Sequence, residues 1–150
     1  FLNSSQTPGE QEEIIEKLNT GKLKLLYLAP ERITNFLPFL QNLNIALFAI
    51  DEAHCISHWG HDFRPDYLSL SRLKEKFPQV PVIALTATAD ILTRKDILGK
   101  LHLKNPEVYL NREKEFFTIW DTDNCKRNYE EIKKFIIDYF YFSISFFCQT

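Results

Sequence analysis

The sequence predicts an α/β fold with a parallel sheet, and two observations carry this prediction. Apolar runs that suit strands, at residues 23–29, 45–50 and 80–85, alternate with segments of helical apolar spacing. Each run is almost continuously apolar, as in strands that are covered on both faces. Strands that alternate with helices in this way are typical of a parallel sheet.

The first two helices are predicted from their ends. Thr7 suits a helix cap and Pro8 the first helical position, and Gly21 ends the segment. A second, short helix is expected over residues 33–40, interrupted by Pro38.

Two further helices are expected at residues 67–77 and 90–101, where apolar residues recur at helical spacing. The positions expected to be buried are Leu68, Leu70, Leu73 and Phe77 in the first, and Ile91, Ile97, Leu98 and Leu101 in the second.

The last part of the chain is predicted to contain short strands at residues 108–110 and 116–120. A polar linker is expected at residues 121–127, then a helical pattern at 129–136 and a strand at 143–148. The sequence contains no methionine and both ends suit strands, so we expect an internal fragment of a longer protein.

Two adjacent acids, Asp51 and Glu52, come directly after the apolar run at residues 45–50. A buried strand that ends in this way places both acids at the carboxyl edge of the sheet, where ligands bind in open α/β folds. A nucleoside triphosphatase needs one acid there to hold Mg²⁺ and another to orient the attacking water. The alternative for an acid pair alone is a helix cap or a solvated surface.

The segment after the acids mixes aromatic faces with charge, as single-stranded nucleic acid binding requires. The residues concerned are Trp59, His61, Phe63 and Arg64. The alternative is a buried helix face, because Trp59, Phe63 and Tyr67 recur every four residues. Gly60 and Pro65 argue against an unbroken helix there.

These residues resemble the RecQ family of DNA helicases, within helicase superfamily 2. Residues 51–54 resemble the family's Walker B box (Asp-Glu-Ala-His), and residues 55–67 resemble its aromatic-rich loop. The resemblance runs from about residue 2 to residue 110, more weakly beyond. It implies an incomplete RecA-like (P-loop NTPase) domain over residues 1–120, a linker at 121–127 and the start of a second RecA-like domain at 128–150.

The resemblance also implies roles for the edge residues, with ATP and Mg²⁺ as cofactors. Asp51 would hold Mg²⁺ through water, and Glu52 would orient or deprotonate the attacking water. His54 would link the nucleotide site to the rest of the motor. Thr86 and Thr88 match motif III, which couples ATP turnover to DNA movement. From spacing alone, the favoured interpretation is that Thr88 or Asp90 caps the next helix.

For DNA, the resemblance implies that the aromatic loop senses a single strand and signals to the ATP site. Arg32 matches motif Ib, along the path of the DNA strand, where it would contact phosphate. From local sequence alone, Pro30-Glu31-Arg32 is a turn with a surface ion pair. The expected partners are therefore single-stranded and partly duplex DNA, and the expected activity is ATP-dependent 3′ to 5′ unwinding in recombination and repair.

The phosphate-binding loop of this class, Gly-x-x-x-x-Gly-Lys-Ser/Thr, does not occur in these residues. We therefore expect the isolated chain to be inactive as an ATPase, and a weak binder of single-stranded nucleic acid is the first alternative. A superfamily 2 RNA helicase, which shares the acidic box, is the second; residues 55–67 argue against it.

Composition excludes some classes. The net charge is −2, so any DNA contact rests on a local patch. The sequence contains no run of about 18 uncharged apolar residues, so no membrane-spanning helix is predicted. Three cysteines without metal spacing suit a reducing cytoplasm.

The spacing of His54 and His58 suggests zinc, but it lacks the inner glutamate of His-Glu-x-x-His, so we expect no zinc site.

Overall fold

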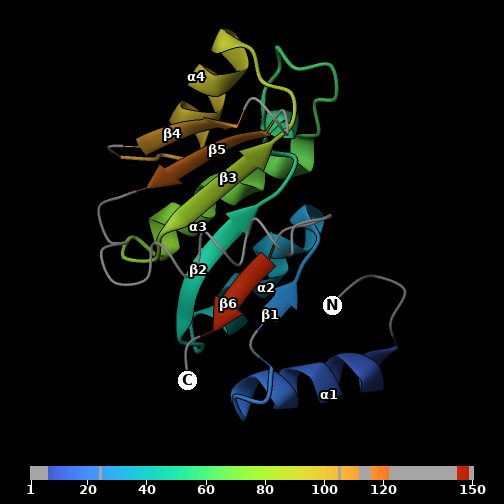
Figure 1. The fold of residues 1–150 in the computed structure, drawn as a ribbon. Coiled ribbons are helices and arrows are strands. Elements are labelled where there is room, and N and C mark those ends of the chain that lie inside the picture. The colour runs from blue at the N-terminus through green and yellow to red at the C-terminus, as the bar shows by residue number, and fades with distance from the viewer. Residues whose placement is uncertain (1–6, 24, 105, 112–115, 122–144, 149–150) are drawn as a thin grey trace.

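The computed structural model describes residues 7–23, 25–104, 106–111, 116–121 and 145–148. The described strands form one six-stranded sheet in the order β1-β6-β2-β3-β5-β4 (Figure 1). Their bounds are Leu25–Tyr27 for β1, Ile45–Ile50 for β2, Val82–Thr86 for β3, Pro106–Asn111 for β4, Phe116–Asp121 for β5 and Ser145–Cys148 for β6.

The first three strands run in the same direction. Strands β2 and β3 pair in parallel, with Phe48 opposite Val82 and Ile50 opposite Ala84. Strands β1 and β2 both pair antiparallel with β6, so β1 shares their direction. The carboxyl ends of β1, β2 and β3 therefore meet at one edge of the sheet. This arrangement confirms the expectation that the acids after β2 lie at the edge where ligands of such sheets bind.

The sheet as a whole is mixed, so the prediction of a parallel sheet is correct only in part. Strand β5 pairs antiparallel with both β3 and β4. Only four residues separate β4 from β5, and so short a connection permits antiparallel pairing but not a parallel crossover. The strands expected at 108–110, 116–120 and 143–148 are all present, as β4, β5 and β6.

Strand β6 lies between β1 and β2 in this same sheet, although residues 128–150 were expected to begin a second domain. The division into domains stays a prediction. Residues 122–127 of the expected linker and the helical pattern at 129–136 lie outside the described residues.

Helix α1, Pro8–Asn19, begins at the predicted cap. The Thr7 hydroxyl accepts a hydrogen bond from the backbone N–H of Glu10, whose carboxylate accepts one from the Thr7 N–H at 2.8 Å. The chain leaves the helix through Gly21, whose φ of 67° is the left-handed conformation that glycine adopts without strain. Helix α2, Ile33–Leu40, runs through Pro38, so the expected interruption is wrong; the proline removes only one intrahelical N–H.

The helix expected over residues 67–77 is divided into a 3₁₀ helix, Pro65–Leu70, and helix α3, Ser71–Lys76. Leu70 and Leu73 are buried as predicted, but Leu68 is exposed, because three residues per turn change its phase. Helix α4, Ile91–Lys100, buries Ile97 as predicted. Ile91 is exposed instead, since it occupies the first position of the helix.

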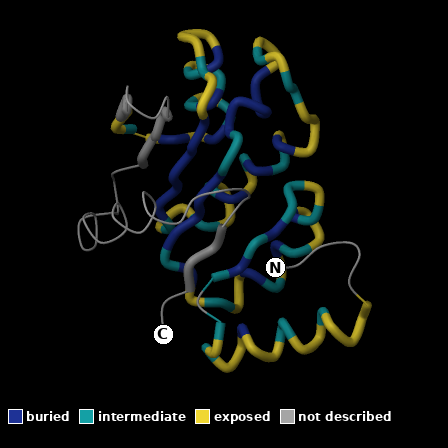
Figure 2. Tube along the Cα trace, turned by 45° about the vertical axis from the view of Figure 1, so that its right-hand side comes forward, coloured by how far each residue is buried: buried dark blue, intermediate teal, exposed yellow. Residues whose placement is uncertain are grey.

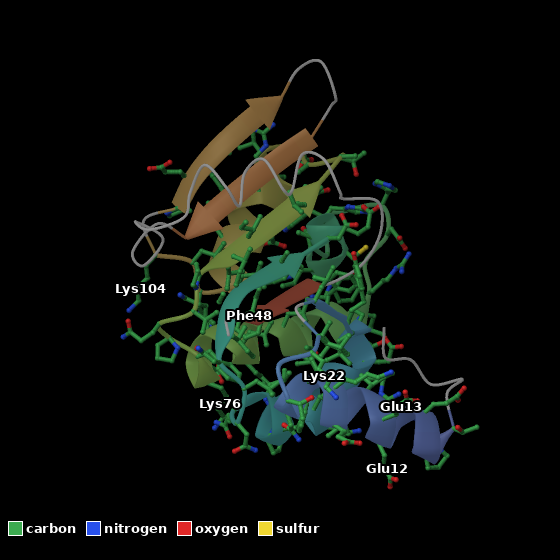
Figure 3. The ribbon with its side chains drawn as sticks, turned by 60° about the horizontal axis from the view of Figure 1, so that its bottom comes forward. Glu12, Glu13, Lys22, Phe48, Lys76 and Lys104 are labelled. Carbon is green, nitrogen blue, oxygen red and sulfur yellow. The ribbon has the colours of Figure 1, made fainter. Side chains whose placement is uncertain are left out.

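Much of the core lies between the sheet and helices α2 and α3; in Figure 1, α3 stands behind β2 and β3, and α2 stands behind β6. Phe48 of β2 is fully buried at its centre (Figure 3), with its ring edge-on to Phe77 at 5.2 Å between centroids. Figure 2 shows the central strands buried, whereas α1 at the periphery is largely exposed. None of the helices in the described residues has the length and apolar character needed to span a bilayer.

Candidate functional site

The acid pair lies at the end of β2, where the chain turns sharply. Asp51 accepts a hydrogen bond on Oδ1 from the Glu52 N–H at 2.9 Å. Glu52 adopts φ 49° and ψ 40°, a left-handed conformation that is strained for a residue with a side chain. Such strain costs of the order of 1–3 kcal/mol and occurs mainly at functional sites. The turn leaves both acids partly exposed at the sheet edge.

His54 connects this turn to the end of β3. Its Nδ1 lies 2.9 Å from the Thr86 hydroxyl and 3.2 Å from Oε2 of Glu52. Thr86 and His54 are 32 residues apart in the chain and both are buried. The structure therefore brings together Glu52, His54 and Thr86, three residues that sequence analysis named separately.

The surrounding groups favour one tautomer of His54. The Thr86 hydroxyl donates to the Thr88 carbonyl and accepts from the Thr88 N–H, both at 3.2 Å. Its remaining acceptor capacity and the Glu52 carboxylate both face Nδ1, which favours the proton on Nδ1 and the lone pair on Nε2. Burial lowers the pKa of His54, although nearby Glu52 opposes this. His54 is thus a neutral donor to Thr86 and Glu52.

Thr88 enters this network only through its backbone, and Ala87 and Thr88 are exposed. The cap of α4 is Asp90, which accepts from the Thr93 N–H at 2.7 Å. The helix-cap interpretation is therefore correct for Asp90, while Thr86 makes the cross-strand contact.

The aromatic segment, residues 55–67, folds back on the edge rather than continuing a helix. Gly60 permits this fold, because a Cβ there would lie 3.0 Å from the His54 carbonyl oxygen. Tyr67 is buried and donates from its hydroxyl to the Asp51 carbonyl at 3.3 Å. Burial raises the pKa of Tyr67, so the hydroxyl stays a donor. The two ends of the segment thus meet at the acid pair.

Trp59 is the most exposed large apolar residue among those described, with 69% of its surface accessible. Its backbone N–H donates to the Ser57 hydroxyl at 3.1 Å, and Ser57 donates to Asp96 of α4 at 2.9 Å. Lys100, one turn along α4, donates to the Ile56 carbonyl at 3.0 Å. Helix α4 therefore anchors the segment while the Trp59 ring faces solvent.

The other predicted loop residues lie near one another. The ring of His61 stacks on that of His54 at 5.3 Å, and the ring of Phe63 lies 3.9 Å from that of His58. The two histidines of the zinc alternative therefore make different contacts. His54 stacks on His61, and the exposed His58 packs on Phe63. Arg64 pairs with Asp62 at 2.7 Å, which lowers the pKa of that carboxyl.

Arg32 lies after β1, at the same sheet edge. It ends the 3₁₀ helix Pro30–Arg32 that comes after β1. Its guanidinium donates to Gln11 of α1 at 3.1 Å and lies over the Phe36 ring at 5.9 Å.

Sequence analysis did not identify four residues that organise the site: Ser57, Asp96 and Lys100, which anchor the loop, and Cys55. Cys55 is fully buried, and its thiol faces Nε2 of His54 and Oδ2 of Asp62, each at 3.7 Å. Burial raises the pKa of the thiol to about 11. Long-range anchors leave no signal in local spacing.

Cys55 is expected to resist alkylation in the folded chain. With a pKa of about 11, roughly one thiol in ten thousand is ionised at pH 7, and only the thiolate reacts. Labelling with iodoacetamide, followed by mass spectrometry of the peptide that contains Cys55, should show modification only in denaturant. Equal labelling with and without urea would contradict the buried position.

Asp96→Ala is expected to loosen the anchor of the loop. The change leaves the Ser57 hydroxyl without its acceptor and removes the carboxylate that pairs with Lys100, so we expect the free energy of unfolding to fall by about 1 kcal/mol. Urea denaturation of the 150-residue chain measures this. The matched control is Lys95→Ala, at an exposed neighbouring position of α4. A loss no larger than that of the control would show that the anchor does not contribute.

A sequence model of the DEAD/DEAH box helicase family matches residues 2–97, which include the acid pair, the loop and Thr86. The chain belongs to this family. Its curated relatives place it more narrowly, as a segment of the RecQ type. The chain is 54% identical over 112 residues to the ATP-dependent DNA helicase RecQ of Pasteurella multocida, a match that covers 73% of the chain and 18% of that protein.

Similarity to other RecQ helicases covers more of the chain. A RecQ helicase of Bacillus subtilis is 42% identical over 137 residues, or 87% of the chain and 23% of that protein. The ATP-dependent DNA helicase Q-like 4B of Arabidopsis thaliana is 41% identical over 148 residues, or 90% of the chain and 13% of that protein. The chain therefore spans between 13% and 23% of the length of these relatives.

Proposed function

We propose that this chain is the part of a RecQ-type DNA helicase that couples Mg-ATP hydrolysis to translocation on single-stranded DNA. The single observation that carries the proposal is the contact of His54 with both Glu52 and Thr86. It joins the acid that would act on the attacking water to the residue that begins motif III. A strand-end acid pair that was merely solvated would not need such a link.

At the nucleotide, Asp51 would hold Mg²⁺ through water, and Glu52 would orient or deprotonate the water that attacks the γ-phosphate. Carboxylates at the end of a parallel strand suit Mg²⁺, which keeps several waters and takes one or two carboxylates. The contact of Glu52 with His54, and of the Asp51 carboxylate with the Glu52 N–H, supports different roles for the two acids. We infer that the remaining phosphate contacts come from groups outside these residues.

Two sets of hydrogen bonds would connect the acid pair to the parts of the chain that respond to DNA. His54 would pass a change at Glu52 to Thr86, whose hydroxyl holds the turn into α4 through Thr88. Tyr67, which donates a hydrogen bond to the Asp51 carbonyl, would transmit a movement of the aromatic segment back to the acids. Coupling by either set would require that these hydrogen bonds form in one state of the motor and break in another.

At the DNA, the exposed ring of Trp59 would stack on a base, worth about 1–3 kcal/mol. Phe63 and His61 belong to the same segment, and Arg64 would exchange Asp62 for a phosphate. Arg32 would contact the strand farther along the same edge. By the resemblance, movement would be 3′ to 5′ and would serve recombination and repair.

A second candidate function applies to the isolated chain: weak binding of single-stranded nucleic acid without hydrolysis. The exposed Trp59 favours it, and the sequence holds no Gly-x-x-x-x-Gly-Lys-Ser/Thr loop. The remaining alternative is a superfamily 2 RNA helicase.

Stimulation of ATP hydrolysis in the whole protein separates these functions. The proposal predicts that single-stranded DNA accelerates hydrolysis strongly and that RNA of the same sequence does so weakly. Equal or greater stimulation by RNA would favour the RNA helicase. Absence of hydrolysis with either polymer would leave only the binding function.

A further inference from the structure

We propose that His54, Cys55 and Asp62 form a binding site for a zinc-class divalent cation, distinct from the Mg²⁺ position at the acid pair. Each residue offers one ligand atom, and the three atoms lie within 4.8 Å of one another. The thiol of Cys55 is the centre of the group, 3.7 Å from Nε2 of His54 and 3.7 Å from Oδ2 of Asp62.

These separations suit tetrahedral zinc. With Zn–S near 2.3 Å and Zn–N or Zn–O near 2.1 Å, ligand atoms of a tetrahedron lie about 3.4–3.6 Å apart. The two separations from the thiol exceed this by only a few tenths of an ångström, and all three ligand atoms lie within 4.8 Å of one another, so the side chains would have to draw closer around the cation. The combination of thiolate, imidazole and carboxylate favours zinc over Mg²⁺, which prefers oxygen ligands alone.

The surroundings of His54 are those of a metal-binding imidazole. A ligating histidine carries its proton on the nitrogen away from the metal and donates it to a carboxylate or another oxygen. Here Nδ1 faces Thr86 and Glu52, while Nε2, which holds the lone pair, faces the thiol. The ring is therefore already oriented for a cation at Nε2.

The cation has a path to the site and a defined chemistry of binding. His54 and Cys55 are buried, but the Asp62 side chain is 45% exposed and opens the group to solvent. As the metal–sulfur bond forms, the S–H bond breaks and its proton goes to solvent. Asp62 gives up its contact with Arg64, and a water completes the four ligands.

Binding of the cation would restrain the movement of the aromatic segment. A cation at this point ties Asp62, in the loop, to His54, which contacts Glu52 and Thr86. The expectation of no zinc site concerned the pair of His54 and His58. The cluster instead uses the cysteine adjacent to His54 and the aspartate of the loop, a spacing that matches no common zinc pattern.

Titration with cobalt(II), a spectroscopic substitute for zinc, tests the site in the 150-residue chain. One equivalent should produce a near-ultraviolet absorption band of thiolate-to-cobalt charge transfer together with the visible bands of tetrahedral cobalt, and zinc should remove both. The bands should be lost in Cys55→Ser and retained in Cys125→Ser. Absence of a thiolate band, or a band that survives Cys55→Ser, would overturn the proposal.

A second variant keeps the test decisive if Cys55→Ser does not fold. Asp62→Asn changes a partly exposed side chain and should weaken cobalt binding by at least about tenfold. Asp66→Asn, the same change at an exposed position of the same segment, should leave the affinity unchanged. Equal affinities of these two variants would remove Asp62 from the ligands and refute the site.

Discussion

Glu52→Gln in the whole protein is expected to lower the rate of ATP hydrolysis by about 100-fold or more while ATP still binds. Glutamine keeps the length of the side chain and its contact with His54, but an amide does not accept a proton from water. General bases of this kind contribute about 10²–10⁴-fold to rate. Single-turnover hydrolysis and a fluorescent-nucleotide binding assay measure the two quantities separately.

The matched control for Glu52 is Glu31→Gln. Glu31 comes after β1 at the same sheet edge and is exposed, so the change alters the same charge in the same region. Its hydrolysis rate should stay within about twofold of the unmodified protein, well inside the effect of a catalytic base. Near-normal turnover in Glu52→Gln would refute the role of Glu52 in catalysis, whereas loss of nucleotide binding would show that the residue acts on affinity instead.

Trp59→Ala is expected to reduce the stimulation of hydrolysis by single-stranded DNA about tenfold, with the DNA-free rate unchanged. The ring is largely exposed and its backbone is held by Ser57, so the change removes a stacking surface without disturbing the loop. Stacking of about 1–3 kcal/mol corresponds to roughly 5- to 150-fold in DNA affinity. Hydrolysis rates measured over a range of DNA concentrations give both maximal stimulation and apparent affinity.

Two further variants show whether stacking is the cause. Trp59→Phe keeps an aromatic face and should restore most of the stimulation. Leu92→Ala removes another exposed apolar side chain, at the start of α4, and should have no effect. Unchanged stimulation in Trp59→Ala, or an equal loss in Leu92→Ala, would reject Trp59 as the DNA sensor.

Sequence reasoning predicted the parts of this site that depend on one strand and the residues directly after it. The apolar run at residues 45–50 is β2 with the predicted bounds, and Asp51 and Glu52 lie at the predicted edge. This succeeded because a fully buried strand has a continuous apolar pattern and its end is marked by charge. The resemblance extended the prediction to Thr86, which local spacing alone would not have selected.

The features that sequence reasoning missed depend on contacts between distant or irregular segments. The left-handed turn at Glu52 occurs at a residue type that rarely adopts it, so no composition signal announces it. The anchoring of Ser57 by Asp96 joins positions 39 residues apart. Leu68 was placed wrongly because a 3₁₀ helix replaced the α-helical phase on which its burial was predicted.

The central claim is that the acid pair acts on Mg-ATP and that the segment beside it senses DNA. The most direct measurement is a structure of the whole protein with Mg²⁺, a non-hydrolysable ATP analogue and a single DNA strand. The account predicts that Mg²⁺ lies next to Asp51 through water, with Glu52 near the γ-phosphate and the Trp59 ring on a base. A metal far from the acids, or Trp59 packed in the protein interior, would contradict it.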